Sequence, residues 1–407
     1  MTRQSPASSD HYTIISADTH AGGSHAAYRE YLDSKHLEEF DAWRAKYRNP
    51  FRDLEPGDNR RLRNWDNELR VTQQEADGVV GEVIFPNTVP PFFPSFVLFA
   101  SPPKPEDYEL RLAGVRAHNR WLTDWCDEYR WQRAGIGQVF LNSIDDAIED
   151  VKWIKDHGLR GGLLLPNIPP DVTWIAPLHD PVYDPFWEIC QDLEVPVNTH
   201  GGTGTPNYGK SPAADLLYVK ENGFFSKRPL VQLTLGGVFE RFPRLRFAIT
   251  EQGCSWVPQM LHELDEVLEK ARTGKRGELR FDKETVLPRS GTEYFRQNCW
   301  LGVSFPNKAD TAAMNEIGIQ RCMWGSDYPH DEGTFPYTRE HLRQIFSQED
   351  PKNLQRILGG NAAELYDFDL DKLAPLADRI GPTVEDIARP LVDLPESPND
   401  ALLRGAA

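Results

Sequence analysis

The chain has 407 residues, of which 39% are apolar and 26% are charged, and its formal net charge is −17. This composition is ordinary for a globular protein, and the negative charge argues against binding nucleic acid or an anionic membrane through a general basic surface. No segment approaches the about 20 apolar residues that a membrane span needs, and the N-terminus lacks the apolar core of a secretory signal. The five cysteines are scattered without a CxxC pair, so we expect reduced thiols and a cytoplasmic location.

Short apolar runs rich in β-branched and aromatic residues alternate with segments of helical periodicity along most of the chain. One helical segment, residues 143–158, opens with a serine and closes with a glycine, as helices often do. Eight strands that alternate with helices predict an α/β protein with a (β/α)8 TIM barrel. The predicted strands are residues 12–18, 79–86, 135–141, 162–166, 195–200, 245–250, 300–304 and 321–327.

We place the barrel at residues 11–368. Four segments inside or outside this range are not needed for a minimal barrel. Residues 1–10 are polar and predict a flexible tail. Residues 21–75 are too long for a simple connection and predict a helical cap over the mouth of the barrel. Residues 87–105 are rich in proline and phenylalanine, which suits an apolar wall for a substrate, a packed loop or an oligomer contact. Residues 369–407 predict a C-terminal arm that wraps a neighbouring chain or the barrel itself.

Five polar residues stand where predicted strands end: Asp18, His20, His200, Glu251 and Asp327. The carboxyl ends of the strands in such a barrel face one mouth, where active sites are built. Two imidazoles and three carboxylates at one mouth are the ligands of a divalent metal such as zinc, manganese or iron. The sequence therefore predicts a metal site, although each residue taken alone would equally suit a cap or a turn.

The local sequence around these residues supports the same interpretation. Asp18 and His20 are two residues apart, so on a strand both side chains point the same way. His200 precedes GGTGT, and glycines there let the backbone approach a ligand closely. Asp327, in WGSDYPHDEGTFP, can ligate a metal or act as the base that activates a bound water.

These motifs resemble the amidohydrolase superfamily, and more narrowly its amidohydrolase-2 branch. The resemblance rests on DxH after the first strand, TH-GG after the fifth, E-x-G-x-x-W-x-P after the sixth and WGSDYPH-x-EGTFP after the eighth. It covers about residues 12–368, and ILGGNAAELYDF resembles the helix that closes barrels in this branch. Its members include decarboxylases of aromatic and unsaturated acids and several hydrolases.

By position, the resemblance implies that Asp18, His20, His200 and Asp327 bind a divalent metal. The family usually begins with His-x-His or Glu-x-His, so Asp18 makes this site more anionic. Many members have a histidine where this chain has Glu251. We expect Glu251 to ligate a metal, bridge to a second ion, orient a bound water, pair with an arginine or support a ligand by a hydrogen bond.

Three further residues are candidates for the site. His330, three residues beyond Asp327, suits a substrate-facing acid, a ligand of a second metal or the start of a helix. Arg228 is a candidate to bind a substrate carboxylate through paired hydrogen bonds, and a solvated loop charge is the alternative. Trp256 suits a pocket wall or the core.

Three functional hypotheses follow. The first is a metal-dependent enzyme that hydrolyses or decarboxylates a small organic acid or amide, with Asp327 moving the proton and Glu251 and His330 assisting. The second is a non-haem di-metal oxygenase that hydroxylates a small substrate with iron or manganese, for which a carboxylate-rich site suits two ions. The third is a non-catalytic partner subunit of a related enzyme. We expect a homo- or hetero-oligomer with a related chain.

Overall fold

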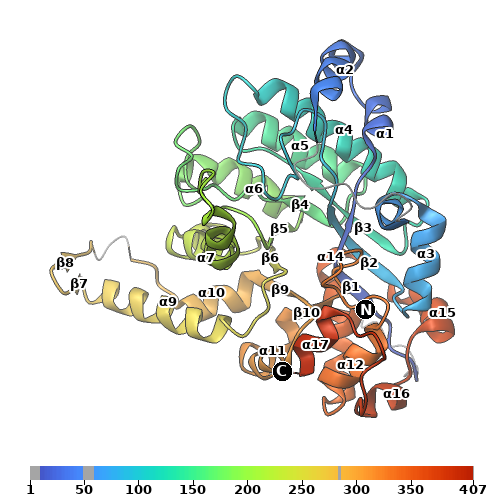
Figure 1. The fold of residues 1–407 in the computed structure, drawn as a ribbon. Helices are drawn as coiled ribbons and strands as arrows, with labels where there is room; N and C mark the ends of the chain where they lie inside the picture. The colour runs from blue at the N-terminus through green and yellow to red at the C-terminus, as the bar shows by residue number, and fades with distance from the viewer. Residues whose placement is uncertain (1–9, 49–58, 283–285, 407) are drawn as a thin grey trace.

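The computed structural model describes residues 10–48, 59–282 and 286–406, and it forms a (β/α)8 barrel (Figure 1). Each neighbouring pair in the eight-stranded sheet is parallel, in the order β1-β2-β3-β4-β5-β6-β9-β10. The bounds are β1 (Ile15–Ala21), β2 (Gly81–Pro86), β3 (Arg133–Gln138), β4 (Gly162–Leu164), β5 (Val197–His200), β6 (Phe247–Thr250), β9 (Cys299–Ser304) and β10 (Cys322–Gly325).

The barrel closes between β10 and β1. A parallel bridge joins Thr19 to Tyr328, and the backbone N–H of His20 donates to the Tyr328 carbonyl at 2.7 Å. The backbone N–H of Asp327 donates to the Asp18 carbonyl at 2.9 Å. Closure therefore ties the two segments that carry the predicted ligands directly to each other.

All eight predicted strands are present, but the first and the third are shifted, the third from residues 135–141 to Arg133–Gln138. We expected the first at residues 12–18, whereas β1 pairs with β2 as far as Ala21 opposite Pro86. Asp18 and His20 therefore lie inside the strand rather than after it. Their polar character concealed this, because buried strand residues are expected to be apolar.

Helices alternate with the strands as predicted. Residues 143–158 contain α5, whose first turn is capped by the Ser143 hydroxyl, which accepts from the Asp146 N–H at 3.2 Å. The longer helices are α4 (Tyr108–Asp127), α5 (Ile144–Asp156), α6 (Asp184–Asp192), α7 (Ala214–Leu235), α9 (Val257–Arg272), α10 (Gly291–Asn298), α11 (Lys308–Ile317) and α12 (Thr338–Phe346). The short ones are α8 (Val238–Arg241), α13 (Pro351–Gln355), η3 (Pro181–Tyr183), η5 (Ile319–Arg321) and η6 (Arg356–Gly360). A small hairpin of β7 (Lys275–Arg276) and β8 (Leu279–Arg280) follows α9.

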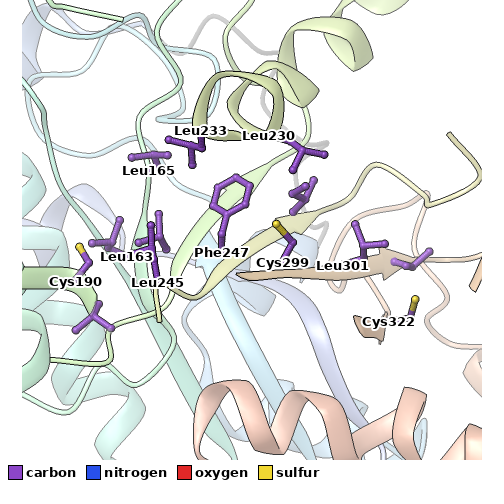
Figure 2. Packing of buried hydrophobic residues seen from close by; sticks show 14 of the residues in the cluster. Leu163, Leu165, Cys190, Leu230, Leu233, Leu245, Phe247, Cys299, Leu301 and Cys322 are labelled. Carbon is purple, nitrogen blue, oxygen red and sulfur yellow. The ribbon is translucent and has the colours of Figure 1, made fainter. Parts of the chain in front are cut away.

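Alternate strand residues pack on the two sides of the barrel wall. Phe247 and Leu301 point outward and are buried against Leu230 and Leu233 of α7 and their neighbours (Figure 2). Their neighbours in sequence point inward instead, where a second cluster fills the barrel with residues such as Ala248, Trp300 and Met323. This two-residue period is what a strand covered on both faces requires.

The amino ends of the strands are covered. Tyr366 of α14 (Asn361–Tyr366) donates its hydroxyl to Asn198 at 2.7 Å, and Phe368 packs into the inner cluster. Phe368 also lies against the start of β2, where a Cβ on Gly81 would be 3.3 Å from its ring. The open end of the barrel is therefore the one at the carboxyl ends of the strands.

The segments outside the barrel are largely helical. Between β1 and β2 lie α1 (His25–Glu30), η1 (Ser34–His36), α2 (Leu37–Lys46), η2 (Asn59–Asn64) and α3 (Asn67–Ala76). Residues 49–58 of the expected cap and residues 1–9 of the expected tail lie outside the described residues. The C-terminal segment contains α15 (Leu370–Ile380), α16 (Val384–Ala388) and α17 (Asp400–Ala406).

The C-terminal segment packs on its own barrel. The amide of Asn399 donates to the carbonyls of Gly333, Thr334 and Phe335, and Leu402 is fully buried. In the described ranges, no helix has the length and apolar character that crossing a membrane would require.

Candidate active site

Asp18, His20 and His200 meet at the open end of the barrel with buried side chains. Oδ1 of Asp18 lies 3.4 Å from His20 Nε2 and 3.3 Å from His200 Nε2. The two imidazole rings stand edge to face, with centroids 4.9 Å apart. One ligand atom from each residue falls within 4.8 Å of the others, which is close enough for one ion to contact all three.

Asp327 joins this group from the other side of the barrel closure. Its Oδ1 lies 3.2 Å from His20 Nε2 and 2.8 Å from His330 Nδ1. His330 stacks on His20 with ring centroids 4.2 Å apart, and its Nε2 lies 3.0 Å from the Asn87 side-chain oxygen. The structure therefore brings together the four ligands that the sequence predicted and places His330 beside them.

His20 and His200 both turn Nε2 toward the Asp18 carboxylate. His20 Nδ1 lies 3.4 Å from the Pro86 carbonyl, and His200 Nδ1 lies 3.1 Å from the Gly201 carbonyl and 3.1 Å from Glu251 Oε2. A hydrogen on Nδ1 satisfies these acceptors and leaves the Nε2 lone pair free to ligate. Oxygen acceptors behind a histidine commonly orient metal ligands in this way.

The residues present fit a divalent metal. Within the described ranges, His20 Nε2 and both carboxylate oxygens of Asp327 are buried, and these atoms make no regular hydrogen bond. Such atoms cost about 1–3 kcal/mol each when left unsatisfied. Ser304, at the end of β9, donates its hydroxyl to Asp18 Oδ2 and leaves Oδ1 facing the histidines. Mixed imidazole and carboxylate ligands suit zinc, manganese or iron.

Electrostatics keep Asp327 ionised. Burial opposes its charge, but His330 and His20 together hold the pKa of Asp327 well below its usual range. Burial lowers the pKa of His20, and His330 lowers it further, so the His20 ring is neutral at pH 7. Burial would also lower the pKa of His330, but the adjacent Asp327 carboxylate outweighs it and raises that pKa. An ionised carboxylate and a neutral imidazole are the forms that bind metals.

His200 and Glu251 interact strongly as well. Burial alone would lower the pKa of His200, but the carboxylates of Glu251 and Asp18 raise it to about 9. Burial raises the pKa of Glu251. A metal that binds His200 Nε2 must therefore displace a proton, which makes metal affinity dependent on pH.

Backbone geometry at two strand ends is unusual. Glu251 and Asp327 both have left-handed backbones, with φ of 58° and 59°. Such conformations cost about 1–3 kcal/mol each in residues other than glycine and are concentrated at functional sites. Here the left-handed turn points each carboxylate toward the histidines immediately after its strand.

Gly201 makes the contact between Glu251 and His200 possible. A Cβ on Gly201 would lie 2.7 Å from both the carbonyl oxygen and Oε2 of Glu251. We therefore expect Gly201→Ala to push Glu251 away from His200 Nδ1, to destabilise the fold by about 1–3 kcal/mol and to weaken metal binding by about 10–100-fold. Urea unfolding and metal titration measure the two effects.

Gly223→Ala is the matched control for this substitution. Gly223 lies in α7, and a Cβ there would meet no atom within 4 Å. Alanine is the better helix former by about 0.5–1 kcal/mol, so this variant should be slightly more stable than the parent chain. Equal metal affinity in the Gly201→Ala and parent proteins would contradict the role given to the contact.

A second group of candidate ligands adjoins the first. Glu251, Asp327, His330 and Glu332 each offer an atom within 4.8 Å of the others. Asp327 belongs to both groups, and Glu251 keeps 21% of its side chain exposed. The arrangement is therefore compatible with one ion bound by the buried residues or with two ions that share Asp327.

Comparison with known proteins agrees with this architecture. A family model described as amidohydrolase matches residues 75–368, which is more than half of the chain. The chain belongs to the amidohydrolase family. A curated relative, gamma-resorcylate decarboxylase of Polaromonas sp. (strain JS666 / ATCC BAA-500), is 22% identical over 238 residues. That match covers 53% of this amidohydrolase and 64% of the relative, which is less than two thirds of its length.

Solved structures of decarboxylases share the fold. The 5-carboxyvanillate decarboxylase of Sphingomonas paucimobilis superimposes with a TM-score of 0.63 at 17% identity, covering 88% of this amidohydrolase and 100% of that chain. The enzyme of the same name from Novosphingobium aromaticivorans, complexed with manganese and 4-hydroxy-3-methoxy-5-nitrobenzoic acid, gives a TM-score of 0.65 at 17% identity. It covers 88% of this chain and 97% of its own.

The loop of residues 87–105 supplies one wall of a cavity of about 580 Å³ at the same end of the amidohydrolase barrel. Phe93 and residues 97–102 line it, opposite residues from the carboxyl ends of β3, β4 and β5. The loop therefore lines a cavity, and its role as an apolar wall for a substrate stays a prediction. Thr203, which lines the cavity, donates its hydroxyl to the His200 carbonyl at 2.8 Å.

Two predicted substrate-binding residues lie outside this cavity lining. The Arg228 guanidinium, on α7, lies 5.8 Å from the ring centroid of Phe225. Its Nη1 is buried with no hydrogen-bond partner in the described part of the chain. Trp256 directs its indole N–H to the Gln252 carbonyl at 3.0 Å, so its polar edge is used within its own turn. A substrate contact for either residue stays a prediction.

Sequence reasoning missed several site residues in this amidohydrolase. Ser304 and Asn87 stand at the ends of predicted strands, so the rule that found His200 also applied to them. Glu332 lies in the same acidic loop as Asp327, and only its distance from Glu251 distinguishes it from its neighbours. Arg111, in the first turn of α4, carried no signal, because a charged residue on a helix is usually solvated.

Proposed function

We propose that this chain is a metal-dependent enzyme that decarboxylates a small aromatic acid. The observation that carries the proposal is the convergence of Asp18, His20, His200 and Asp327, all buried, at the end of the barrel that also holds the cavity lined by Phe93 and Thr203. A cavity lined by aromatic and aliphatic side chains together with a few polar groups suits a small molecule. The relatives named decarboxylases support carboxylate removal rather than another reaction.

Asp18, His20, His200 and Asp327 are the proposed ligands of manganese, zinc or iron. When bound, the metal would attract and polarise the oxygen atoms of a substrate carboxylate and its neighbour. A relative was solved with manganese and a nitrobenzoic acid, which supports a metal of this kind. Glu251 would hold His200 in the orientation that ligation needs, through the 3.1 Å contact at Nδ1.

Side chains of this protein can supply the proton that decarboxylation requires. Decarboxylation breaks a carbon–carbon bond and leaves its electron pair on the ring carbon, which then needs a proton. Protonated His330, whose Nδ1 lies 2.8 Å from Asp327 Oδ1, would supply that proton, and Asp327 Oδ1 would relay it to the ring carbon. The Phe85 ring, 4.5 Å from the His200 ring, is fully buried and would keep water from this side of the site.

Hydrolysis of an amide uses the same groups in a different order. Asp327 would take a proton from water and return it to the leaving nitrogen. The two reactions differ in substrate rather than in the residues required, so the relatives' names are what favour decarboxylation.

A second candidate function rests on the group of Glu251, Asp327, His330 and Glu332. If these residues bind a second ion, the site would suit a di-metal oxygenase that uses iron or manganese to hydroxylate a small substrate. Oxygen consumption that depends on substrate, in protein with two iron ions per chain, would favour this reaction over decarboxylation.

The test is to purify the chain without oxygen, count metal ions per chain and offer 2,6-dihydroxybenzoate and 5-carboxyvanillate. We expect one manganese or zinc ion per chain and release of CO2 in equal amount to the phenolic product. Release of ammonia from amides, without CO2 from either acid, would favour hydrolysis. If the protein binds no divalent metal and converts none of these compounds, the remaining hypothesis is a non-catalytic partner subunit.

Further parts of the proposal concern location and assembly. The five cysteines are free and buried, which supports a reducing cytoplasm. The net charge of −17 supports a function without nucleic acid. The helix α7 exposes Leu216, Val219 and Phe224, and exposed apolar side chains of this size support an oligomer with itself or a related chain. Light scattering that gives the mass of one chain would contradict the oligomer.

A further inference from the structure

The cavity that Thr203 links to the backbone of His200 contains a buried cation. Arg111 of α4 lines it and is 7% exposed. Its Nη1 donates to the Ser101 carbonyl at 3.0 Å, while its Nε is buried without a hydrogen-bond partner in the described part of the chain. Among residues 10–48, 59–282 and 286–406, no carboxylate lies within 4.0 Å of the guanidinium. A single neutral carbonyl is thus its only polar partner there.

Two aromatic rings hold this guanidinium in place. Its central carbon lies 4.2 Å from the ring centroid of Phe93 and 5.5 Å from that of Phe140. Phe93 comes from the loop after β2 and Phe140 from the residues just after β3. The charge is therefore held rigidly between apolar groups, where an ionic contact would be strong because little water screens it.

Two amide side chains face the same cavity. Gln138, the last residue of β3, is 1% exposed, and both its side-chain nitrogen and oxygen are buried without a partner among the described residues. Its backbone is fixed by Asn119, which accepts from the Gln138 N–H at 2.8 Å and donates to the Gln138 carbonyl at 2.9 Å. The side-chain oxygen of Asn167 is also buried and unpartnered in this part of the chain.

Burying these polar groups without partners would cost free energy of folding if they had only a structural role. A buried arginine is normally paired, and a buried amide normally makes hydrogen bonds. If Arg111 served only to hold the loop at Ser101, an apolar side chain of similar length would lose one hydrogen bond and avoid the burial of a charge. A ligand that carries a negative group and a hydrogen-bonding group would satisfy Arg111 and Gln138 together.

We propose that this cavity binds the ring of the substrate and that Arg111 holds a second acidic group of that substrate, with Gln138 bonding to a neighbouring polar substituent. The proposal rests on the proposed function, and it narrows the substrate to an aromatic acid with two acidic groups. One group faces the metal ligands and the other faces Arg111. Thr203 connects the two sites, because it lines the cavity and bonds to the backbone of His200.

Binding of benzoate and benzamide to the full chain tests the subsite. The two probes have the same shape and differ in charge, so their difference in affinity reports on the cation. Calorimetry on the His200→Ala protein without added metal removes the contribution of the metal site. We expect benzoate to bind at least about tenfold more tightly than benzamide, which corresponds to 1.4 kcal/mol. Equal affinity of the two probes would overturn the proposal.

Arg111→Met keeps an apolar side chain of similar length and removes the charge. This variant should lower benzoate affinity about tenfold and leave benzamide affinity within about twofold. Arg130→Met is the matched control, because Arg130 is exposed, pairs with Asp127 and lies outside the cavity lining. An unchanged preference for benzoate in Arg111→Met would contradict the subsite. The comparison of the two probes on the His200→Ala protein decides the matter if Arg111→Met does not fold.

Failure of the subsite and failure of the proposed function give different results. Protein that binds metal and releases CO2, but does not prefer benzoate, loses only the subsite. Protein that prefers benzoate through Arg111, but has no turnover, keeps the subsite and loses the reaction. When turnover is present, benzoate should compete with the substrate, and Arg111→Met should raise KM more than it lowers kcat. Inhibition that does not compete with substrate would show that the bound anion is a separate ligand and would overturn the assignment.

Discussion

Replacing His200 by alanine should lower the affinity for a divalent metal by more than about a hundredfold, because loss of a group behind a ligand alone costs about 10–100-fold. His200 supplies the nitrogen that lies 3.3 Å from Asp18 Oδ1, and it is one of the three residues that a single ion could contact there. Alanine also leaves Glu251 without the imidazole that it contacts. Elemental analysis after dialysis and CO2 release measure the loss of metal and of turnover.

Two variants control for indirect effects of this substitution. His262→Ala removes an exposed histidine of α9 that is 3.7 Å from Glu266, so metal content and turnover should not change. Glu251→Gln keeps the shape of the side chain that contacts His200, and we expect the smaller loss of about 10–100-fold in metal affinity. Full metal content in His200→Ala protein would show that the metal, if present, binds elsewhere.

Replacing Glu82 by glutamine should destabilise the fold by about 3–5 kcal/mol, because breaking a buried ion pair leaves an uncompensated charge. Glu82 of β2 accepts from Arg70 at 2.7 Å and 3.0 Å and lies 3.3 Å from Arg133. All three side chains are buried. Arg70 also donates to the His20 carbonyl at 2.8 Å, so this cluster supports the strand that carries two predicted ligands.

The same substitution should change how stability depends on pH. Burial would raise the pKa of Glu82, but Arg70 and Arg133 outweigh it and lower that pKa below the ordinary value of 4.5. The unfolded chain therefore binds this proton at a higher pH than the folded chain does. The stabilisation is complete above about pH 5 and is lost as the pH falls below about 4 through the lowered pKa.

Urea unfolding of the two proteins between pH 3 and pH 8 measures both effects. The difference in free energy of unfolding between wild type and Glu82→Gln should be constant above about pH 5 and should shrink below about pH 4. Glu266→Gln removes an exposed carboxylate that pairs with Lys270, and it should leave the midpoint unchanged at every pH. Equal stability of Glu82→Gln and wild type at pH 7 would mean that the cluster contributes nothing.

Local sequence patterns predict the barrel and most of the candidate metal ligands. Apolar runs with helices between them specify parallel strands, because a strand covered on both faces must be apolar throughout. A polar residue such as His200 at the end of such a run can only face the open end of the barrel. These patterns involve residues close together in the sequence, so they can be recognised without a structure.

The contacts between polar groups depend on the tertiary structure. Arg111 and Gln138 are 27 positions apart in sequence, and their side chains face one cavity because α4 packs beside β3. Glu251 contacts His200 because strands β5 and β6 are neighbours and because its backbone turns into the left-handed region. The periodicity of apolar residues predicts which residues are buried. It does not predict which groups a buried charged side chain contacts. Those contacts depend on how segments that are distant in the sequence pack together in the folded chain.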